Sequence, residues 1–192
     1  MLPTASDTRV FGLVLAAGAG SRFGGPKGLA RTADGDAWVA RAVRMLQDGG
    51  CRDVLVTVGA APEEVAALVP VSAVVVRVDD WAEGLSASLR AGLAAAGAAG
   101  AEVVVVATVD TPDLPASAVV RVLSIASRPA AALVQATYRG RPGHPVVIGA
   151  EHLDAVIASL EGDRGARPYL SAHGAVEVDC SDLWSGADID SR

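Results

Sequence analysis

Lysine is almost missing from this chain of 192 residues: Lys27 is the only lysine among 16 basic side chains, and all the others are arginine. Long apolar runs are missing too. Apolar residues make up 51% of the chain, but they come in short runs, well below the roughly 20 residues that span a bilayer. We therefore expect no membrane as a partner.

A basic surface and a secretory signal are also lacking. The formal net charge is −6, whereas binding to nucleic acid or to an anionic membrane depends on a basic surface, so neither is an expected partner. The N-terminus, MLPTASDTRV, has no basic start and no long apolar stretch, and we expect a cytoplasmic protein. Cys51 and Cys180 share no metal-type or redox-type spacing, which predicts two buried thiols without a chemical role.

The chain does contain a repeated alternation of strand and helix patterns. Short apolar, β-branched runs predict strands at 10–15, 53–59, 73–78, 102–109, 131–138 and 144–148, and an edge strand at 175–180. Helical patterns lie between most of them, and such alternation is typical of a mainly parallel sheet with helices on both faces. We predict one three-layer, Rossmann-like α/β domain over residues 1–192. Ligands of such a sheet bind beyond the carboxyl ends of its strands.

The first predicted strand runs into a glycine-rich loop, LAAGAGSRFGGPKGL (15–29), which contains Lys27. Small residues let backbone N–H groups approach phosphate oxygens closely. The loop does not fit the dinucleotide fingerprint, because Phe23 stands where the third glycine belongs and no acidic residue closes the second strand. It does not fit the P-loop either, because Pro26 precedes Lys27 and Gly28 follows it. The loop therefore indicates a phosphate site of another kind.

The remaining pattern, Leu-Ala-Ala-Gly-x-Gly-x-Arg-Phe-Gly-x-Pro-Lys, resembles the signature loop of the sugar-phosphate and cofactor nucleotidyltransferases. The similarity is greatest to the molybdenum cofactor cytidylyl- and guanylyltransferases, the MobA/MocA-like group. Later segments resemble the same group, so the resemblance covers nearly the whole chain: WAEGLSASLRAGL (81–93), VDTPDL (109–114), GRPGHPVVIG (140–149), GDRGARPYL (162–170) and DID (188–190).

This resemblance implies the nucleotide-diphospho-sugar transferase fold and a Mg²⁺-dependent or Mn²⁺-dependent reaction. A nucleotidyl group would pass from a nucleoside triphosphate to a phosphorylated acceptor, with release of pyrophosphate. The implied acceptor is molybdopterin or the molybdenum cofactor, a pterin, and a molybdoenzyme is an implied protein partner. The Leu-Ala-Ala-Gly start has alanine where guanylyl enzymes commonly carry glycine, which favours CTP over GTP.

The resemblance also assigns roles to residues around the nucleotide. Arg22 and Lys27 would contact the phosphates, where fixed positive charge lowers the barrier to attack on the α-phosphate. Gly84 and Ser88 would help to bind the base or ribose, although Ser86 and Ser88 fit helix capping equally well. The loop backbone would cradle the nucleotide through Leu15, Ala16, Ala17, Gly18, Ala19 and Gly20.

Carboxylates for a metal ion are expected at two places. Asp110 follows the strand 102–109 and matches the family's metal-ligand position, and Mg²⁺ usually takes one or two protein carboxylates. A turn cap beside Pro112 is the alternative role for Asp110. A second carboxylate is expected from Asp188 or Asp190, and the residues alone do not choose between them.

Four further residues are candidates for binding the acceptor. His144 precedes a predicted strand, and a hydrogen-bonded structural histidine fits the same position. Asp163, Arg164 and Arg167 open a predicted helix and would meet the acceptor's phosphate. An ordinary capped and charged helix start fits them equally well.

Two other functions fit the same chain. The segments GHPVVIG, GDRGARPYL and VDCSDL also resemble members of this group described as nicotine blue oxidoreductases, which reduce a quinone-like pigment with NAD(P)H. The missing dinucleotide fingerprint weighs against that function. The third function is a nucleotide-binding accessory protein for a molybdoenzyme, with little or no turnover.

Overall fold

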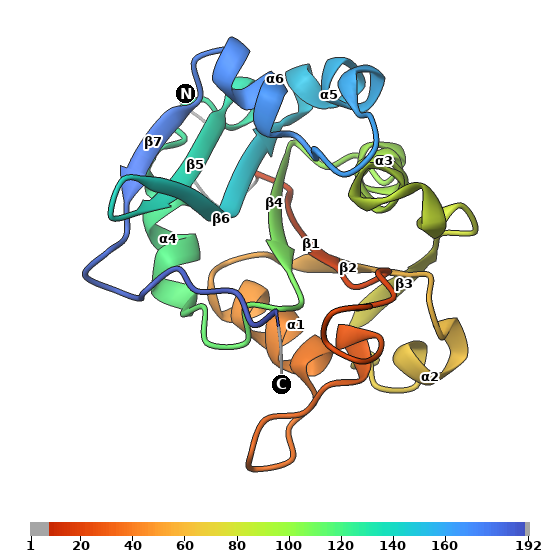
Figure 1. The fold of residues 1–192 in the computed structure, drawn as a ribbon. Helices are drawn as coiled ribbons and strands as arrows, with labels where there is room; N and C mark the ends of the chain where they lie inside the picture. The colour runs from red at the N-terminus through yellow and green to blue at the C-terminus, as the bar shows by residue number, and fades with distance from the viewer. Residues whose placement is uncertain (1–7, 191–192) are drawn as a thin grey trace.

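The computed structural model describes residues 8–190 (Figure 1). Residues 1–7, on which our expectation about a secretory signal partly rests, and residues 191–192 lie outside the described part. Among residues 8–190, no helix has the length and apolar character needed to cross a membrane.

A seven-stranded sheet forms the centre of the described chain, in the order β3-β2-β1-β4-β6-β5-β7. Strand β6 runs antiparallel to its neighbours β4 and β5, and the other four pairs are parallel. The predicted mainly parallel sheet is therefore confirmed. The strands are β1 (Val10–Leu15), β2 (Asp53–Val58), β3 (Ala73–Arg77), β4 (Val103–Thr108), β5 (Leu133–Tyr138), β6 (Arg141–Gly149) and β7 (Val176–Asp179).

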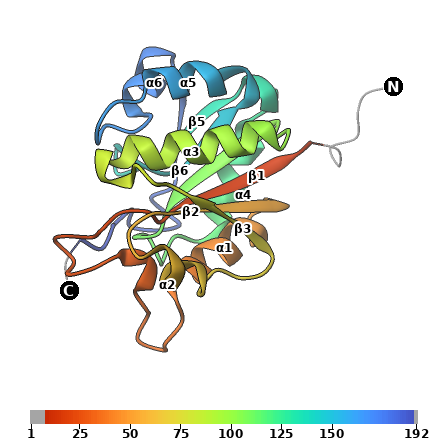
Figure 2. The same ribbon diagram turned by 90° about the vertical axis from the view of Figure 1, so that its right-hand side faces the viewer.

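Helices cover both faces of this sheet, as Figure 2 shows from the side. Buried side chains of three helices pack on one face: α1 (Trp38–Asp48), α2 (Pro62–Ala66) and α4 (Ala116–Ile125). Buried side chains of three others pack on the opposite face: α3 (Leu85–Ala98), α5 (Leu153–Ser159) and α6 (Arg167–Ala172). The fold is thus the predicted three-layer α/β arrangement.

The two apolar clusters follow from the alternation of side chains along each strand. In β4, Val105 packs with the α1 and α4 side, whereas Val104 and Val106 pack with the α3 side. Because successive residues of a strand face opposite sides, a strand covered on both faces needs an unbroken apolar run. The run VVVV in β4 is such a sequence, and Val104 and Val105 are fully buried.

The burial predicted for the two cysteines is confirmed. Cys51 and Cys180 are both buried and unpaired. Burial raises the pKa of the Cys51 thiol to about 12, so this thiol stays protonated and unreactive near neutral pH.

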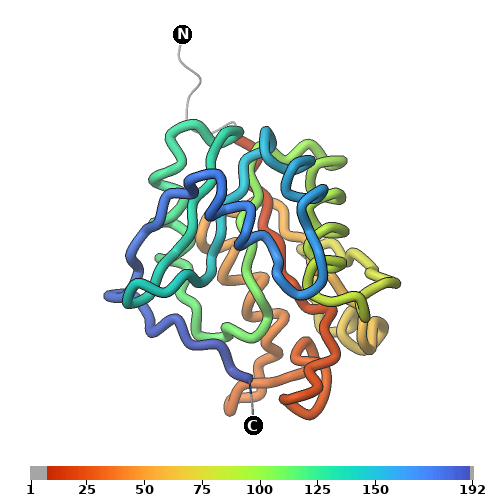
Figure 3. The backbone as a smooth tube through the Cα atoms, turned by 45° about the horizontal axis from the view of Figure 1, so that its top comes forward, coloured from red at the N-terminus to blue at the C-terminus, as the bar shows by residue number. Residues whose placement is uncertain are grey.

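The fold gathers distant parts of the chain at one edge of the sheet. The carboxyl ends of the parallel strands β1 and β4 lie side by side, and the segment after β7 returns to the same edge (Figure 3). There the backbone N–H of Ile189 donates to the carbonyl oxygen of Asp110 over 3.0 Å. The glycine-rich loop, the end of β4 and the C-terminal segment thus meet at one place.

Candidate nucleotide and metal site

The glycine-rich loop folds back on itself around Gly20. The Gly20 carbonyl accepts hydrogen bonds from the backbone N–H groups of Phe23, Gly24 and Gly25, at 2.9, 3.0 and 3.2 Å. Gly20 has a φ of 60°, and a Cβ at this position would overlap the carbonyl oxygen of Gly25. Glycine is therefore required here by both conformation and space. The turn places Lys27 at the start of a short 3₁₀ helix, beside the end of β4.

The loop forms one wall of a cavity of about 470 Å³, which we call the loop cavity. All residues predicted to bind the nucleotide line it, together with Asp110 and Asp163. Ser88 is among them and is nearly buried in the first turns of α3. The lining residues drawn from the prediction are Leu15, Ala16, Ala17, Gly18, Ala19, Gly20, Arg22, Lys27, Gly84 and Ser88.

Lys27 lies between two carboxylates. Its Nζ atom is 3.1 Å from Oδ2 of Asp110 and 2.8 Å from Oδ1 of Asp190. Burial on its own would lower the pKa of Lys27, but the hydrogen bonds and negative charges of Asp190 and Asp110 raise it overall. The hydrogen bond and the charge of Lys27 lower the pKa of Asp190. Lys27 and Asp190 are therefore both charged at neutral pH, and Lys27 is a fixed cation in the lining of the loop cavity.

Three carboxylates converge at the same place. One ligand oxygen each from Asp110, Asp188 and Asp190 lies within 4.8 Å of the others. The hydrogen bond from the Ile189 N–H to the Asp110 carbonyl explains this, because it holds the residues on either side of Ile189 against the end of β4. Hard oxygen donors of this kind suit Mg²⁺ or Mn²⁺. The sequence left the choice between Asp188 and Asp190 open, and the structure brings both to Asp110.

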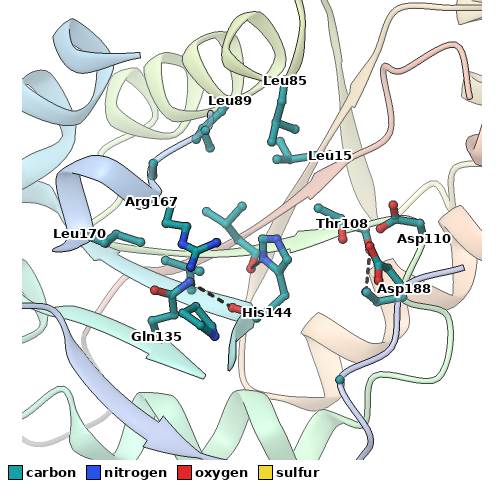
Figure 4. Close-up of a pocket in the computed structure, with 18 of the residues that line it drawn as sticks. Leu15, Leu85, Leu89, Thr108, Asp110, Gln135, His144, Arg167, Leu170 and Asp188 are labelled. Carbon is teal, nitrogen blue, oxygen red and sulfur yellow. Dashed lines mark hydrogen bonds between the residues drawn. The ribbon is translucent and has the colours of Figure 1, made fainter. Parts of the chain in front are cut away.

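A second cavity, of about 400 Å³, adjoins the first (Figure 4). We call it the β6 cavity, because His144 and other residues of β6 line it. Its floor is apolar, and Gln135 and Arg167 lie at its far end from Asp110 in the view of Figure 4. The two cavities share four lining residues: Leu15, Leu85, Thr108 and Asp110. The carboxylate of Asp110 thus stands at their junction.

Of the predicted acceptor-binding residues, His144, Arg164 and Arg167 line the β6 cavity, but Asp163 does not. Like Arg164, Asp163 does not open the helix α6, which begins at Arg167. Its Oδ1 instead accepts the backbone N–H of Leu85 at 3.2 Å and so caps the start of α3. This carboxylate satisfies a donor of a helix that lies far from it in the sequence.

The alternative prediction that Ser86 or Ser88 caps α3 is wrong. The residue before the helix is Gly84, and neither serine side chain makes a capping hydrogen bond. Ser86 Oγ is buried without a hydrogen-bond partner among the described residues, while Ser88 faces the loop cavity. The Asp163 side chain instead supplies the acceptor for the first N–H group of the helix.

Sequence reasoning missed Gln135 and Trp184, which also line the β6 cavity. Gln135 had a visible signal, because it is the one strongly polar side chain in the apolar run of β5. Trp184 had none, since its place depends on how the segment after β7 returns to the sheet edge. There its ring packs edge-on against Tyr138, with the ring centres 5.2 Å apart.

Comparison with known proteins agrees with this geometry. Residues 12–177 match the family described as the MobA-like NTP transferase domain. A protein of Paenarthrobacter nicotinovorans named nicotine blue oxidoreductase is 36% identical over 193 residues, covering 95% of this chain and 92% of the relative.

Solved structures have the same fold. The crystal structure of Rv0371c from Mycobacterium tuberculosis has a TM-score of 0.79 and 26% identity, covering 96% of this chain and 93% of that one. A second structure of Rv0371c is described as a complex with manganese, with a TM-score of 0.73 and 24% identity over 90% and 88% of the two chains. A nucleotidyl transferase from Methanothermobacter thermautotroptrophicus shares the fold at a TM-score of 0.77, with 23% identity over 95% and 92%. The family match and the curated relative confirm the resemblance carried by the signature loop, and the chain belongs to the MobA-like NTP transferase family.

Proposed function

We propose that this protein is a divalent-metal-dependent nucleotidyltransferase. It would transfer a nucleoside monophosphate from a nucleoside triphosphate to a phosphorylated acceptor and release pyrophosphate. The observation that carries the proposal is the position of Lys27, which lies against Asp110 and Asp190 in the lining of a glycine-rich cavity. Fixed positive charge beside a carboxylate cluster is what attack on an α-phosphate requires.

The chain's own residues would bind and orient the nucleotide. Loop residues such as Gly18 and Gly20 leave room for a nucleotide close to the backbone, and Gly20 shapes the turn. Lys27 and Arg22 would offset the negative charge that develops on the reacting phosphate. The acceptor's phosphate is already ionised at neutral pH, so the reaction needs no general base and depends on alignment.

Asp110, Asp188 and Asp190 would hold the metal ion, since their oxygens already converge. A bound Mg²⁺ or Mn²⁺ supplies positive charge that polarises the phosphoryl oxygens. The manganese complex described for Rv0371c supports a divalent ion for this fold. The ammonium group of Lys27 already lies against Asp110 and Asp190, so the negative charge of these carboxylates favours a cation at this place.

The two adjoining cavities fit two substrates. We assign the nucleotide to the loop cavity and the acceptor to the β6 cavity, so that they meet at Asp110. We favour CTP, because of the Leu-Ala-Ala-Gly start of the loop, and a phosphorylated pterin such as molybdopterin, because of the family. A molybdoenzyme would then receive the product.

A second candidate is an NAD(P)H-dependent oxidoreductase, and one observation favours it: the relative that is 36% identical is named nicotine blue oxidoreductase. Two assays separate the candidates. With Mg²⁺ or Mn²⁺, a nucleoside triphosphate and molybdopterin, the transferase releases pyrophosphate only when both metal and acceptor are present. Oxidation of NADPH by a quinone-like dye, without any pyrophosphate, would instead support the oxidoreductase.

A further inference from the structure

The β6 cavity has hydrogen-bond acceptors on its strand side and cations on its helix side. Apolar side chains line much of it, among them Val106, Val146 and Ile148 of the sheet and Leu89 of α3. Such a lining suits a flat ring. The polar groups around it then decide which ring is bound.

One contact orients the ring of His144, and a second holds its backbone. Its Nδ1 atom lies 3.2 Å from the carbonyl oxygen of Val106, and the hydroxyl of Tyr138 donates to the backbone carbonyl of His144 over 2.7 Å. A backbone carbonyl can only accept, so Nδ1 must carry the proton. Nε2 is then an unprotonated acceptor, and no described residue donates to it.

The imidazole is also kept neutral. Burial lowers the pKa of His144, and the hydrogen bond with the Val106 carbonyl and the negative charges of Asp110 and Asp188 only partly oppose this. At neutral pH the ring therefore presents a lone pair to the cavity rather than a second N–H group.

Gln135 offers a second acceptor beside the first. Its Nε2 donates to the carbonyl oxygen of Gly143 over 3.5 Å, a long hydrogen bond that still fixes which end of the amide is which. Its Oε1 is left to accept. On the helix side, Arg164 and Arg167 line the cavity and their side chains form no ion pair with any described residue.

We propose that His144 and Gln135 are specificity-determining residues, which select a flat heteroaromatic acceptor that carries ring N–H donors along one edge and an anionic group towards Arg164 and Arg167. The proposal rests on the proposed function, because it takes the β6 cavity as the acceptor site. A ring without N–H donors would leave two desolvated acceptors unpaired, which costs more binding energy than the hydrogen bonds themselves contribute.

The test compares two fluorescent pteridines that differ at two ring nitrogens, which carry hydrogen in one compound and methyl in the other. Lumazine has two ring N–H groups, and 1,3-dimethyllumazine has none. By equilibrium dialysis, the wild-type protein should bind lumazine about tenfold more tightly than the dimethyl compound. His144→Phe keeps a flat ring but removes the acceptor, and it should abolish this preference. His152→Phe is the matched control, since the ring of His152 contacts Tyr169 and lies outside the β6 cavity.

Gln135→Leu gives an independent variant in case His144→Phe does not fold, and it should reduce the preference in the same direction. The proposal is overturned if the wild-type protein binds neither compound, if it binds both equally, or if the variants keep the preference. Lys27→Ala separates failure of this selection from failure of the proposed transferase function, because Lys27 lines the loop cavity and not the β6 cavity. That variant should keep the lumazine preference while losing nucleotidyl transfer. If the wild-type protein transfers the nucleotidyl group but binds both pteridines equally, the selection by His144 and Gln135 is overturned, while the proposed function stands.

Discussion

The Nζ atom of Lys27 lies 2.8 Å from Oδ1 of Asp190, so the loop after β1 is tied directly to the C-terminal segment. The same Nζ atom contacts Asp110, which already accepts a backbone hydrogen bond from Ile189. A single cation therefore joins the three segments that build the candidate site. This explains why a compact ammonium group suits the position, where a planar guanidinium would need a two-pronged partner.

Replacing Lys27 tests its role in transfer. Lys27→Ala should lower nucleotidyl transfer by about 10²- to 10³-fold, because it removes a cation from the reacting phosphate. Lys27→Arg keeps the charge but not its shape, and it should recover only part of the activity. Circular dichroism should show both variants folded. Wild-type activity in folded Lys27→Ala would remove this residue from the site.

The loop turn can be tested with a matched pair of glycines. Gly20→Ala places a Cβ against the Gly25 carbonyl at a positive φ, so it should lower the melting temperature and weaken nucleotide binding. Gly18→Ala meets no atom within 4 Å and should leave the melting temperature unchanged. Equal melting temperatures for the two variants would mean that the loop is not folded around Gly20.

The capping role of Asp163 predicts an effect on stability. Asp163→Ala removes the acceptor for the Leu85 N–H and should lower the free energy of unfolding by about 1 kcal/mol, measured by urea denaturation. Glu161→Ala is the control, because this exposed neighbour makes no side-chain hydrogen bond or ion pair with a described residue. If the two variants were equally stable, Asp163 would not cap α3.

The buried thiol of Cys51 predicts a loss of stability at alkaline pH. Its pKa is about 12 in the folded protein and near 9.0 when unperturbed, so its contribution is complete below about pH 9 and is lost as pH rises towards 12. The free energy of unfolding should fall by up to about 1.4 kcal/mol per pH unit for this group over that range. Cys51→Ala should show a shallower decline in urea denaturation measured across the same pH values. An unchanged slope would contradict the burial of an ionisable thiol.

Much of the fold could be predicted from the sequence, because parallel strands that are buried on both faces appear as continuous apolar runs. The seven predicted strands all exist, although β6 begins at Arg141 rather than at residue 144. Its antiparallel direction could not be predicted, since an apolar run carries no information about direction. Pro142 and Gly143 also hid its first half, because both residues are poor strand formers.

The candidate site was predictable where chemistry follows a strand directly, as at Asp110 and the loop after β1. One late carboxylate was expected from the resemblance, but the residues alone did not predict that both late aspartates join Asp110, because a long-range backbone contact decides this. Asp188 and Asp190 approach Asp110 only because Ile189 docks on the end of β4. Asp163 likewise serves a helix that starts 78 residues earlier in the chain.

We propose that the α-phosphate of a nucleotide is transferred at the junction marked by Asp110. The most direct measurement incubates the protein with Mg²⁺, molybdopterin and CTP labelled with ³²P at either the α or the γ position, and follows both labels by chromatography. We expect the α label to appear in the acceptor and the γ label in pyrophosphate, and Asp110→Asn to abolish both. Transfer of the γ label to the acceptor, or no transfer of either label while NADPH is oxidised in a parallel assay, would contradict it.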